Sequence, residues 1–138
     1  MPRRGPKTLA GAPSIGRLTR RAEFLAVAGT RRKAVMPGLI LQVRRHDGQQ
    51  QPREDEPAVR VGFTASRKVG NAVIRNRARR RLRSAAAEIL SAHAAPGHDF
   101  VVIARGATPA RPYAALKDDL TGALRRLKIW RDPTETMP

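Results

Sequence analysis

The sequence predicts a small α+β domain, a two-layer αβ(β)βαβα sandwich with its helices packed on one sheet. Its 138 residues have the length of one domain with a modest core. Some segments alternate apolar and polar residues as strands do, and others repeat apolar residues at helical spacing. Because the two kinds of segment are interspersed along the chain, we expect a layer of helices on a single small sheet.

The first part of the chain predicts an arm, a helix and a strand. Residues 1–16 are rich in Pro, Gly and Arg, so we expect a mobile basic arm. Apolar residues over 17–28 recur at helical spacing and predict a short helix, which Gly29 can end. The segment GLILQVRR, 38–45, predicts the first of two or three strands, and the polar stretch 46–57 predicts a loop.

The second part predicts a strand, a long helix, a buried strand and a last helix. The segment AVRVGFTAS, 58–66, alternates cleanly between a core face and an open face. Asn71 is suited to cap a helix that reaches Ala92. The mostly apolar run 98–105 predicts a buried strand, and leucines at helical spacing predict a helix over 113–129. Residues 17–130 therefore form the expected domain, and 131–138 a tail.

The charge of the chain indicates a polyanionic partner. The formal net charge is +17, from 28 Lys and Arg against 11 Asp and Glu. Such an excess repels itself unless nucleic acid or an anionic membrane neutralises it. No apolar run approaches the roughly 20 residues of a spanning helix, and the most basic helix lacks Trp and Phe, so we expect nucleic acid and no membrane.

The absence of cysteine excludes thiolate catalysis, disulfides and zinc-finger sites. It also suits a reducing compartment. The N-terminus has no continuous apolar segment of the kind found in a secretory signal, so we expect a cytoplasmic protein. An N-terminus rich in Arg and free of acids is also compatible with an organelle transit peptide.

The basic residues are concentrated in VIRNRARRRLR, 73–83, which has six arginines in nine positions and no acid. An apolar stripe from Ile74 to Ala92 docks this helix on the sheet, and the arginines occupy the whole exposed surface. Like charges at i, i+4 repel, and arginines in the first turn oppose the helix dipole. Guanidinium groups in this arrangement are favourable beside phosphates, which they bind in a bidentate manner.

No other residues form a convincing catalytic or metal site. His46, His93 and His98 lack metal-ligand spacing and are expected on the surface. The neighbouring Asp118 and Asp119 face different directions on their helix and are expected to be solvated. We therefore expect no catalytic residue and no metal ligand in this chain.

The segment SRKVGNAVIRNRARRRLR, 66–83, resembles the signature of the protein subunit of bacterial ribonuclease P. The matching residues are Lys68, Val69, Gly70, Ala72, Val73, Arg75, Asn76, Arg77, Arg79, Arg80 and Arg83. Flanking agreement covers RLTRRAEF at 17–24, RVGFTAS at 60–66 and DFVVIARG at 99–106. The resemblance thus extends over most of the chain from 17 to 127.

The resemblance implies a sandwich like that of certain ribosomal proteins, with a left-handed crossover around the arginine helix. It implies that a catalytic RNA carries the active site and its Mg²⁺, with one protein copy per RNA. The residues implied to bind that RNA are Arg67, Lys68, Arg75, Asn76, Arg77, Arg79, Arg80 and Arg83.

The resemblance also implies a cleft between the first helix and the open sheet face for the 5′ leader of precursor tRNA. The residues implied to line it are Phe24, Ile40, Gln42, Gly62, Thr64 and Ser66. Phe24 could stack on a base or belong to the core. Members of the family often have further aromatic residues where this chain has Ala28 and Gln42, so weaker stacking is expected.

Two other functions are compatible with the residues alone. The first is a ribosomal or other structural RNA-binding protein without a substrate cleft. The second is a DNA-binding protein with the arginine helix in a major groove, although no helix-turn-helix spacing accompanies that helix. The leading interpretation is a protein that assists RNA-based removal of the 5′ leader from precursor tRNA.

Overall fold

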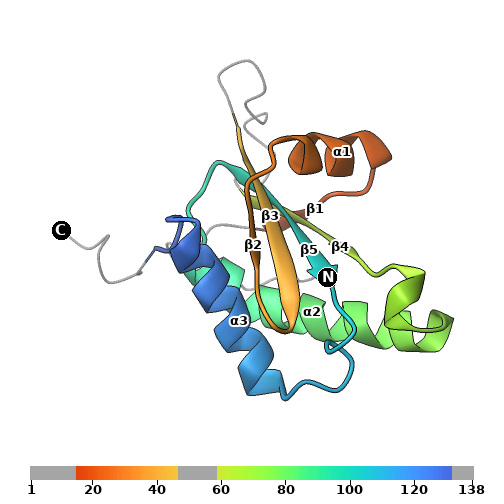
Figure 1. Ribbon diagram of the computed structural model, residues 1–138. Coiled ribbons are helices and arrows are strands. Elements are labelled where there is room, and N and C mark those ends of the chain that lie inside the picture. The colour runs from red at the N-terminus through yellow and green to blue at the C-terminus, as the bar shows by residue number, and fades with distance from the viewer. Residues whose placement is uncertain (1–14, 47–58, 132–138) are drawn as a thin grey trace, which may run out of the picture.

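The computed structural model describes residues 15–46 and 59–131. The elements, in chain order, are β1 (Ile15–Arg17), α1 (Arg21–Gly29), β2 (Lys33–Val35), β3 (Leu39–Arg45), β4 (Val59–Thr64), the 3-10 turn η1 (Arg67–Val69), α2 (Ala72–His93), β5 (His98–Ala104) and α3 (Tyr113–Arg126). The sheet has the strand order β1-β4-β5-β3-β2, with β5 in its centre (Figure 1). The predicted α+β class is confirmed.

The sheet is mixed, because strands pair in both directions across it. β4 pairs in parallel with β1 and β5, whereas β3 pairs antiparallel with β5 and β2. Two parallel neighbours need a crossover, and α2 provides it between β4 and β5. That this crossover is left-handed remains an expectation from the family resemblance.

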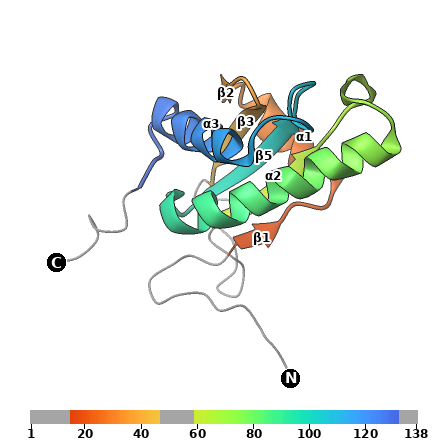
Figure 2. The ribbon, with the colours of Figure 1, turned by 90° about the horizontal axis from the view of Figure 1, so that it is seen from below.

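Helices lie on both faces of the sheet. α2 and α3 cover one face, where they enclose the larger hydrophobic core around Leu41, Phe100 and Val102 (Figure 2). α1 packs on the opposite face through a smaller cluster of Leu18, Val27 and Val101. The second layer of the predicted sandwich is thus α2 with α3, and α1 leaves part of the other sheet face uncovered.

The long helix α2 forms as its sequence predicts. The Asn71 side chain accepts a hydrogen bond from the backbone of Ile74 at 3.0 Å and so caps the first turn. The buried residues of its docking stripe are Ala78, Leu82, Ala85, Ala86 and Leu90. Ala92 was wrongly assigned to this stripe: it lies in the last turn of the helix and is exposed.

The boundaries of several elements differ from the predictions. β1 includes Ile15 and Gly16, which were expected in the arm, and the three-residue β1 and β2 are too short to show a period. α1 begins only at Arg21, since the Glu23 carboxylate accepts hydrogen bonds from the backbones of Thr19 and Arg20, both at 2.9 Å. Residues 1–14 of the predicted arm, the predicted loop from residue 47 onward and the predicted tail beyond 131 lie outside the described residues.

The last helix ends earlier than predicted, in a Schellman motif. Ile129 donates its backbone N–H to Leu124 at 2.9 Å, and Lys128 donates to Arg125 at 3.0 Å. Lys128 takes the left-handed conformation that this motif requires, with φ of 63°. The motif turns the chain back toward the end of α2.

Asp119 fastens α3 to the loop between β2 and β3, and the expectation that it is solvated is wrong. Its carboxylate accepts hydrogen bonds from the backbone of Gly38 at 2.9 Å and from Arg111 Nε at 2.6 Å. A Cβ at Gly38 would overlap both partner side chains, so this close approach requires glycine. Asp119 is buried, whereas its neighbour Asp118 is exposed as expected.

We expect Asp119→Ala to lower the free energy of unfolding by about 2–4 kcal/mol, because it leaves a buried N–H and a guanidinium without their acceptor. Asp118→Ala removes the same charge one position away and should change stability by less than about 0.5 kcal/mol. Urea unfolding of both variants measures the difference. Equal effects would show that the buried carboxylate does not fasten α3.

Candidate nucleic-acid interface

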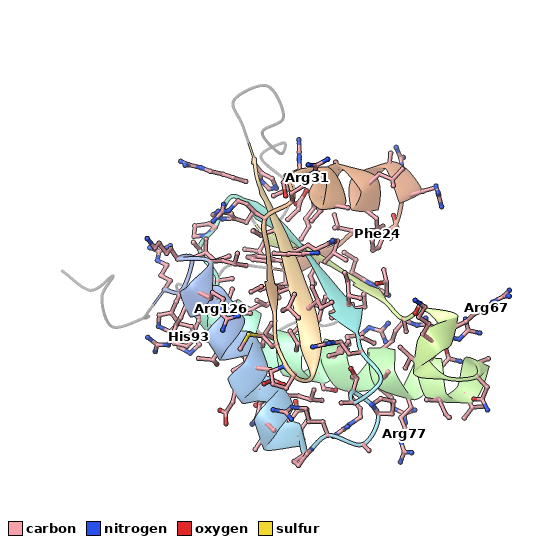
Figure 3. All side chains as sticks on the ribbon, in the orientation of Figure 1. Phe24, Arg31, Arg67, Arg77, His93 and Arg126 are labelled. Carbon is pink, nitrogen blue, oxygen red and sulfur yellow. The ribbon has the colours of Figure 1, made fainter. Side chains whose placement is uncertain are left out.

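The residues that the sequence predicts to bind RNA lie together on η1 and the first half of α2. We call them the arginine surface: Arg67, Lys68, Arg75, Asn76, Arg77, Arg79, Arg80 and Arg83. Arg67 and Arg77 project from this end of the molecule (Figure 3). The side chains are exposed, apart from the half-buried Arg75 and Arg79. Their grouping follows from the short turn that joins η1 directly to α2.

The cations of the arginine surface have no acidic partner among the described residues. Arg79 donates a hydrogen bond to the amide oxygen of Asn76, and the Arg83 guanidinium lies over the Phe63 ring at 5.6 Å. The Nε atom of Arg75 is buried and has no hydrogen-bond partner in the described part of the chain. These contacts orient the guanidinium groups without neutralising them, so the surface is suited to bind phosphates.

Arg81 was wrongly grouped with the exposed arginines of this helix. Its guanidinium donates hydrogen bonds to the backbone carbonyls of Thr108, Pro109 and Arg111, the first at 2.7 Å and the second at 2.9 Å. It thereby holds the segment between β5 and α3 against α2. The local pattern could not separate Arg81 from Arg80, because the acceptors are contributed by a segment almost 30 residues further along the chain.

On the other face of the sheet, the strand registers align side chains in three rows. Arg44, Asp99 and Arg60 form the first row. Gln42, Val101 and Gly62 form the second, on which α1 packs. Ile40, Ile103 and Thr64 form the third, and all three are half-buried. Four of the residues predicted for the leader cleft, Ile40, Gln42, Gly62 and Thr64, therefore share this face, and Ser66 lies beyond the end of β4.

Phe24 lies where α1 meets the second row (Figure 3). It is half-buried and packs with Leu18, Val27 and Val101. A Cβ at Gly62 would overlap the edge of its ring, so glycine allows the ring to rest on the sheet. Phe24 therefore contributes to the packing of α1 and still exposes part of its side chain beside the third row.

A chain of charged groups fixes α1 to the sheet. Glu23 pairs with Arg60 at 3.1 Å, and Arg60 binds the buried Asp99 through two bonds of 2.9 and 2.8 Å. Hydrogen bonds from the Arg20 and Thr19 backbones, together with Arg60, lower the pKa of Glu23. Burial alone would raise the pKa of Asp99, but hydrogen bonds from Arg60 and His46 outweigh it and lower that pKa. Both carboxylates are therefore ionised near neutral pH and hold Arg60 in place.

The histidines are less exposed than the sequence suggests. His46 bonds Asp99 at 2.7 Å, and His98 is buried with its ring near the carbonyls of Ala95 and Pro96. Burial lowers the pKa of His98. His93 stacks on Trp130 with ring centroids 3.9 Å apart. Over 15–46 and 59–131, no group of three or more His, Cys, Asp or Glu side chains is placed to hold a metal ion.

Comparison with known proteins agrees with this geometry. The family model Ribonuclease P matches residues 13–128. The ribonuclease P protein component of Paramagnetospirillum magneticum is 52% identical over 116 residues, which are 84% of this chain and 85% of the relative. That of Gluconacetobacter diazotrophicus is 46% identical and covers 82% of this chain and 91% of the relative.

The chain belongs to the ribonuclease P protein family. Solved structures share the fold: the RNase P protein of Staphylococcus aureus covers 83% of this chain and 97% of its own, at a TM-score of 0.64 and 21% identity. That of Thermotoga maritima has a TM-score of 0.61 and 22% identity. Family membership identifies the chain as a protein subunit that assists RNA-based processing of the tRNA 5′ end. In the described part of the chain, no helix is both long and apolar enough to cross a membrane.

The contrast between neighbouring arginines of α2 gives a test. Arg81→Ala leaves three carbonyl acceptors without their donor, so we expect the free energy of unfolding to fall by about 1–3 kcal/mol. Arg80→Ala removes an exposed cation and should leave stability within about 0.5 kcal/mol of the wild type. Thermal and urea unfolding of the two variants, compared side by side, make the measurement. A stable Arg81→Ala variant would argue against a structural role for this arginine.

Proposed function

We propose that the arginine surface binds the catalytic RNA of ribonuclease P, while the uncovered part of the sheet beside α1 holds the 5′ leader of precursor tRNA. The observation that carries the proposal is a surface of guanidinium groups without internal counter-charge, adjoining a half-exposed sheet face. Ser66 and η1 connect the two, because β4 leads directly into the arginine surface. One protein could thus contact the enzyme's RNA and its substrate together.

Each surface is suited to a different kind of contact. Arginines on the exposed side of α2 reach phosphates of a folded RNA and contribute affinity without reading sequence. The third row of the sheet, Ile40, Ile103 and Thr64, is small and partly apolar, and Phe24 lies beside it. Single-stranded RNA binds such faces by placing its bases on aromatic and apolar side chains. A leader is single-stranded and present only in the precursor, so this contact favours precursor over product.

The catalytic RNA carries out the chemistry in this proposal. Mg²⁺ is expected to act there, and the described residues contribute no carboxylate cluster to hold it. We further propose one protein copy per RNA and a cytoplasmic location, which a cysteine-free chain suits. The residues alone are also compatible with a ribosomal or a DNA-binding protein, but family membership favours neither of these functions.

Replacing Arg75, Arg77, Arg79 and Arg80 together with Ala should weaken binding to the catalytic RNA and flatten its salt dependence. Each lost phosphate contact removes up to about one unit from the slope of log K against log salt. Filter binding of the RNA at several salt concentrations measures both quantities. The same four positions changed to Lys keep the charge, so the slope should persist although bidentate contacts are lost.

An Ala variant with wild-type affinity and slope would show that this helix is not the RNA contact. Precursor cleavage by the variant at high protein concentration, with catalytic RNA and Mg²⁺ present, checks that the leader face still works. Cleavage at the mature 5′ end by protein free of RNA would contradict the placement of the active site in the RNA.

The leader contact is tested at Phe24. Phe24→Leu keeps an apolar side chain between α1 and the sheet but removes the ring, so it separates stacking from packing. We expect it to weaken the affinity of the reconstituted holoenzyme for precursor tRNA by about 1 kcal/mol, the lower end of the range for one base stack, and to leave mature tRNA unaffected. Gln42→Tyr, on the same face, should tighten precursor binding.

Circular dichroism of both variants monitors the fold. Phe24→Ala serves as a comparison, because it removes stacking and packing together and should also lower stability. If the Leu variant lost the same affinity for precursor and for mature tRNA, Phe24 would have a purely structural role.

A further inference from the structure

A second group of cations lies at the opposite end of α2 from the arginine surface. His93 and Arg126 lie at this end, and Arg67 and Arg77 at the other (Figure 3). α2 has 22 residues, so its two ends are about 33 Å apart. At physiological ionic strength charges are screened over about 8 Å. The two groups of cations are therefore electrostatically independent in water.

The fold assembles this group from segments that are distant in the sequence. After the Schellman motif of α3, the chain returns along the end of α2: Ile129 accepts from the Ala95 backbone at 3.3 Å, and Arg131 donates to His93 at 2.7 Å. Trp130 and Ala94 form a β-bridge in the same place. Arg45 ends β3 directly opposite His98 of β5. The C-terminal segment, α2 and the sheet edge thus meet at one corner.

At this corner the side chains surround an open hollow of about 360 Å³. The described residues that line it include Arg32, Arg45, Lys128, Arg131, His98 and Trp130. They include four cations and no acid, and none of the four cations forms an ion pair with a described residue. A hollow of this kind is positive throughout, and the partner it fits is an anion.

Some of the cations have a role within the fold, and others do not. Arg32 donates to the Leu127 carbonyl at 2.8 Å and so caps the end of α3. Arg125, which does not line the hollow, lies over the Trp130 ring at 4.3 Å. Arg45 and Arg131 are exposed, and their side chains have no hydrogen bond to another described residue. These two guanidinium groups are therefore available to a ligand.

We propose that this hollow, which we call the distal phosphate site, binds a backbone phosphate of RNA. Guanidinium groups from two segments can hold one phosphate between them, and Lys128 adds a third cation at the rim. Trp130 already stacks with His93 and Arg125, so the contact is to the phosphate and not to a base. The inference rests on the proposed function, because it takes RNA to be the partner. The protein then bridges two RNA segments about 30 Å apart.

The test uses the protein with its catalytic RNA and precursor tRNA. The variant Arg45→Gln with Arg131→Gln removes the two free guanidinium groups and keeps Arg32 in place. The matched control, Arg17→Gln with Arg21→Gln, removes two exposed arginines elsewhere on the molecule. We measure the affinity of each protein for the catalytic RNA alone. We also measure the affinity of each reconstituted holoenzyme for precursor and mature tRNA, in both cases at several salt concentrations.

We expect the distal variant to bind RNA about tenfold more weakly, with a salt slope lower by about one to two units, and the control to bind catalytic RNA as the wild type does. Loss with the catalytic RNA alone identifies that RNA as the source of the phosphate. Loss of affinity only in the measurements with tRNA identifies the substrate tRNA as the source of the phosphate. Affinities equal to those of the control in every arm would overturn the proposal.

A second measurement uses the wild-type protein, so it does not depend on the folding of a variant. Trp130 is the only tryptophan of the chain and lines the hollow. Its fluorescence should therefore change when the protein is saturated with catalytic RNA, or when the holoenzyme is saturated with precursor tRNA. No change in either titration would also overturn the distal phosphate site. The quadruple Ala variant of the arginine surface, measured in parallel, tests the proposed function separately, because the distal site is unaltered in it.

Discussion

The fold depends on ion pairs made by a small number of acidic side chains. The described residues contain five carboxylates, and all but Asp118 bond a basic side chain. These bonds join Glu23 to Arg60, Asp99 to Arg60, Arg44 and His46, Asp119 to Arg111, and Glu88 to Lys117. Each one connects two different elements or an element and a loop. These acids pair with cations inside the fold. The arginine surface and the distal phosphate site are therefore left without acidic partners among the described residues, and their positive charge suits an external polyanion.

The elements with a strong local signal could be predicted from the sequence. Asn71 followed by a four-residue repeat of small and apolar residues specifies α2, and the alternation from Val59 to Thr64 specifies β4. β1 and β2 could not be predicted, because three residues are too few to show a period and their pairing depends on strands elsewhere in the chain. The residues that the family resemblance implied to bind RNA lie together on η1 and α2, and their contact with RNA stays a prediction.

Long-range contacts account for the remaining errors. Arg81, Asp119 and His46 are polar residues that local patterns assign to the surface, yet each bonds a group from another segment. The cations of the distal corner were missed for the same reason, since Arg45 and Arg131 are 86 positions apart and neither belongs to a motif. A basic cluster assembled only by the tertiary fold has no signature in a single sequence.

In the proposed function, Phe24 serves both the fold and a ligand. The ring rests on Gly62 and helps to bury Val101, so α1 cannot move away from the sheet without exposing this small cluster. The same contact holds the ring against the second row. The family resemblance leads us to expect further aromatic residues where this chain has Ala28 and Gln42, so the stacking proposed for this face rests on the Phe24 ring.

The central position of β5 has a consequence for how the protein is made. Without β5 the sheet consists of two unconnected pairs, β1 with β4 and β2 with β3. A ribosome has therefore synthesised all of α2, with its six arginines, before the strand that completes its docking surface emerges. During that interval the arginine-rich segment has no complete sheet on which to dock. Faster synthesis of the residues up to Ala104 would shorten this interval.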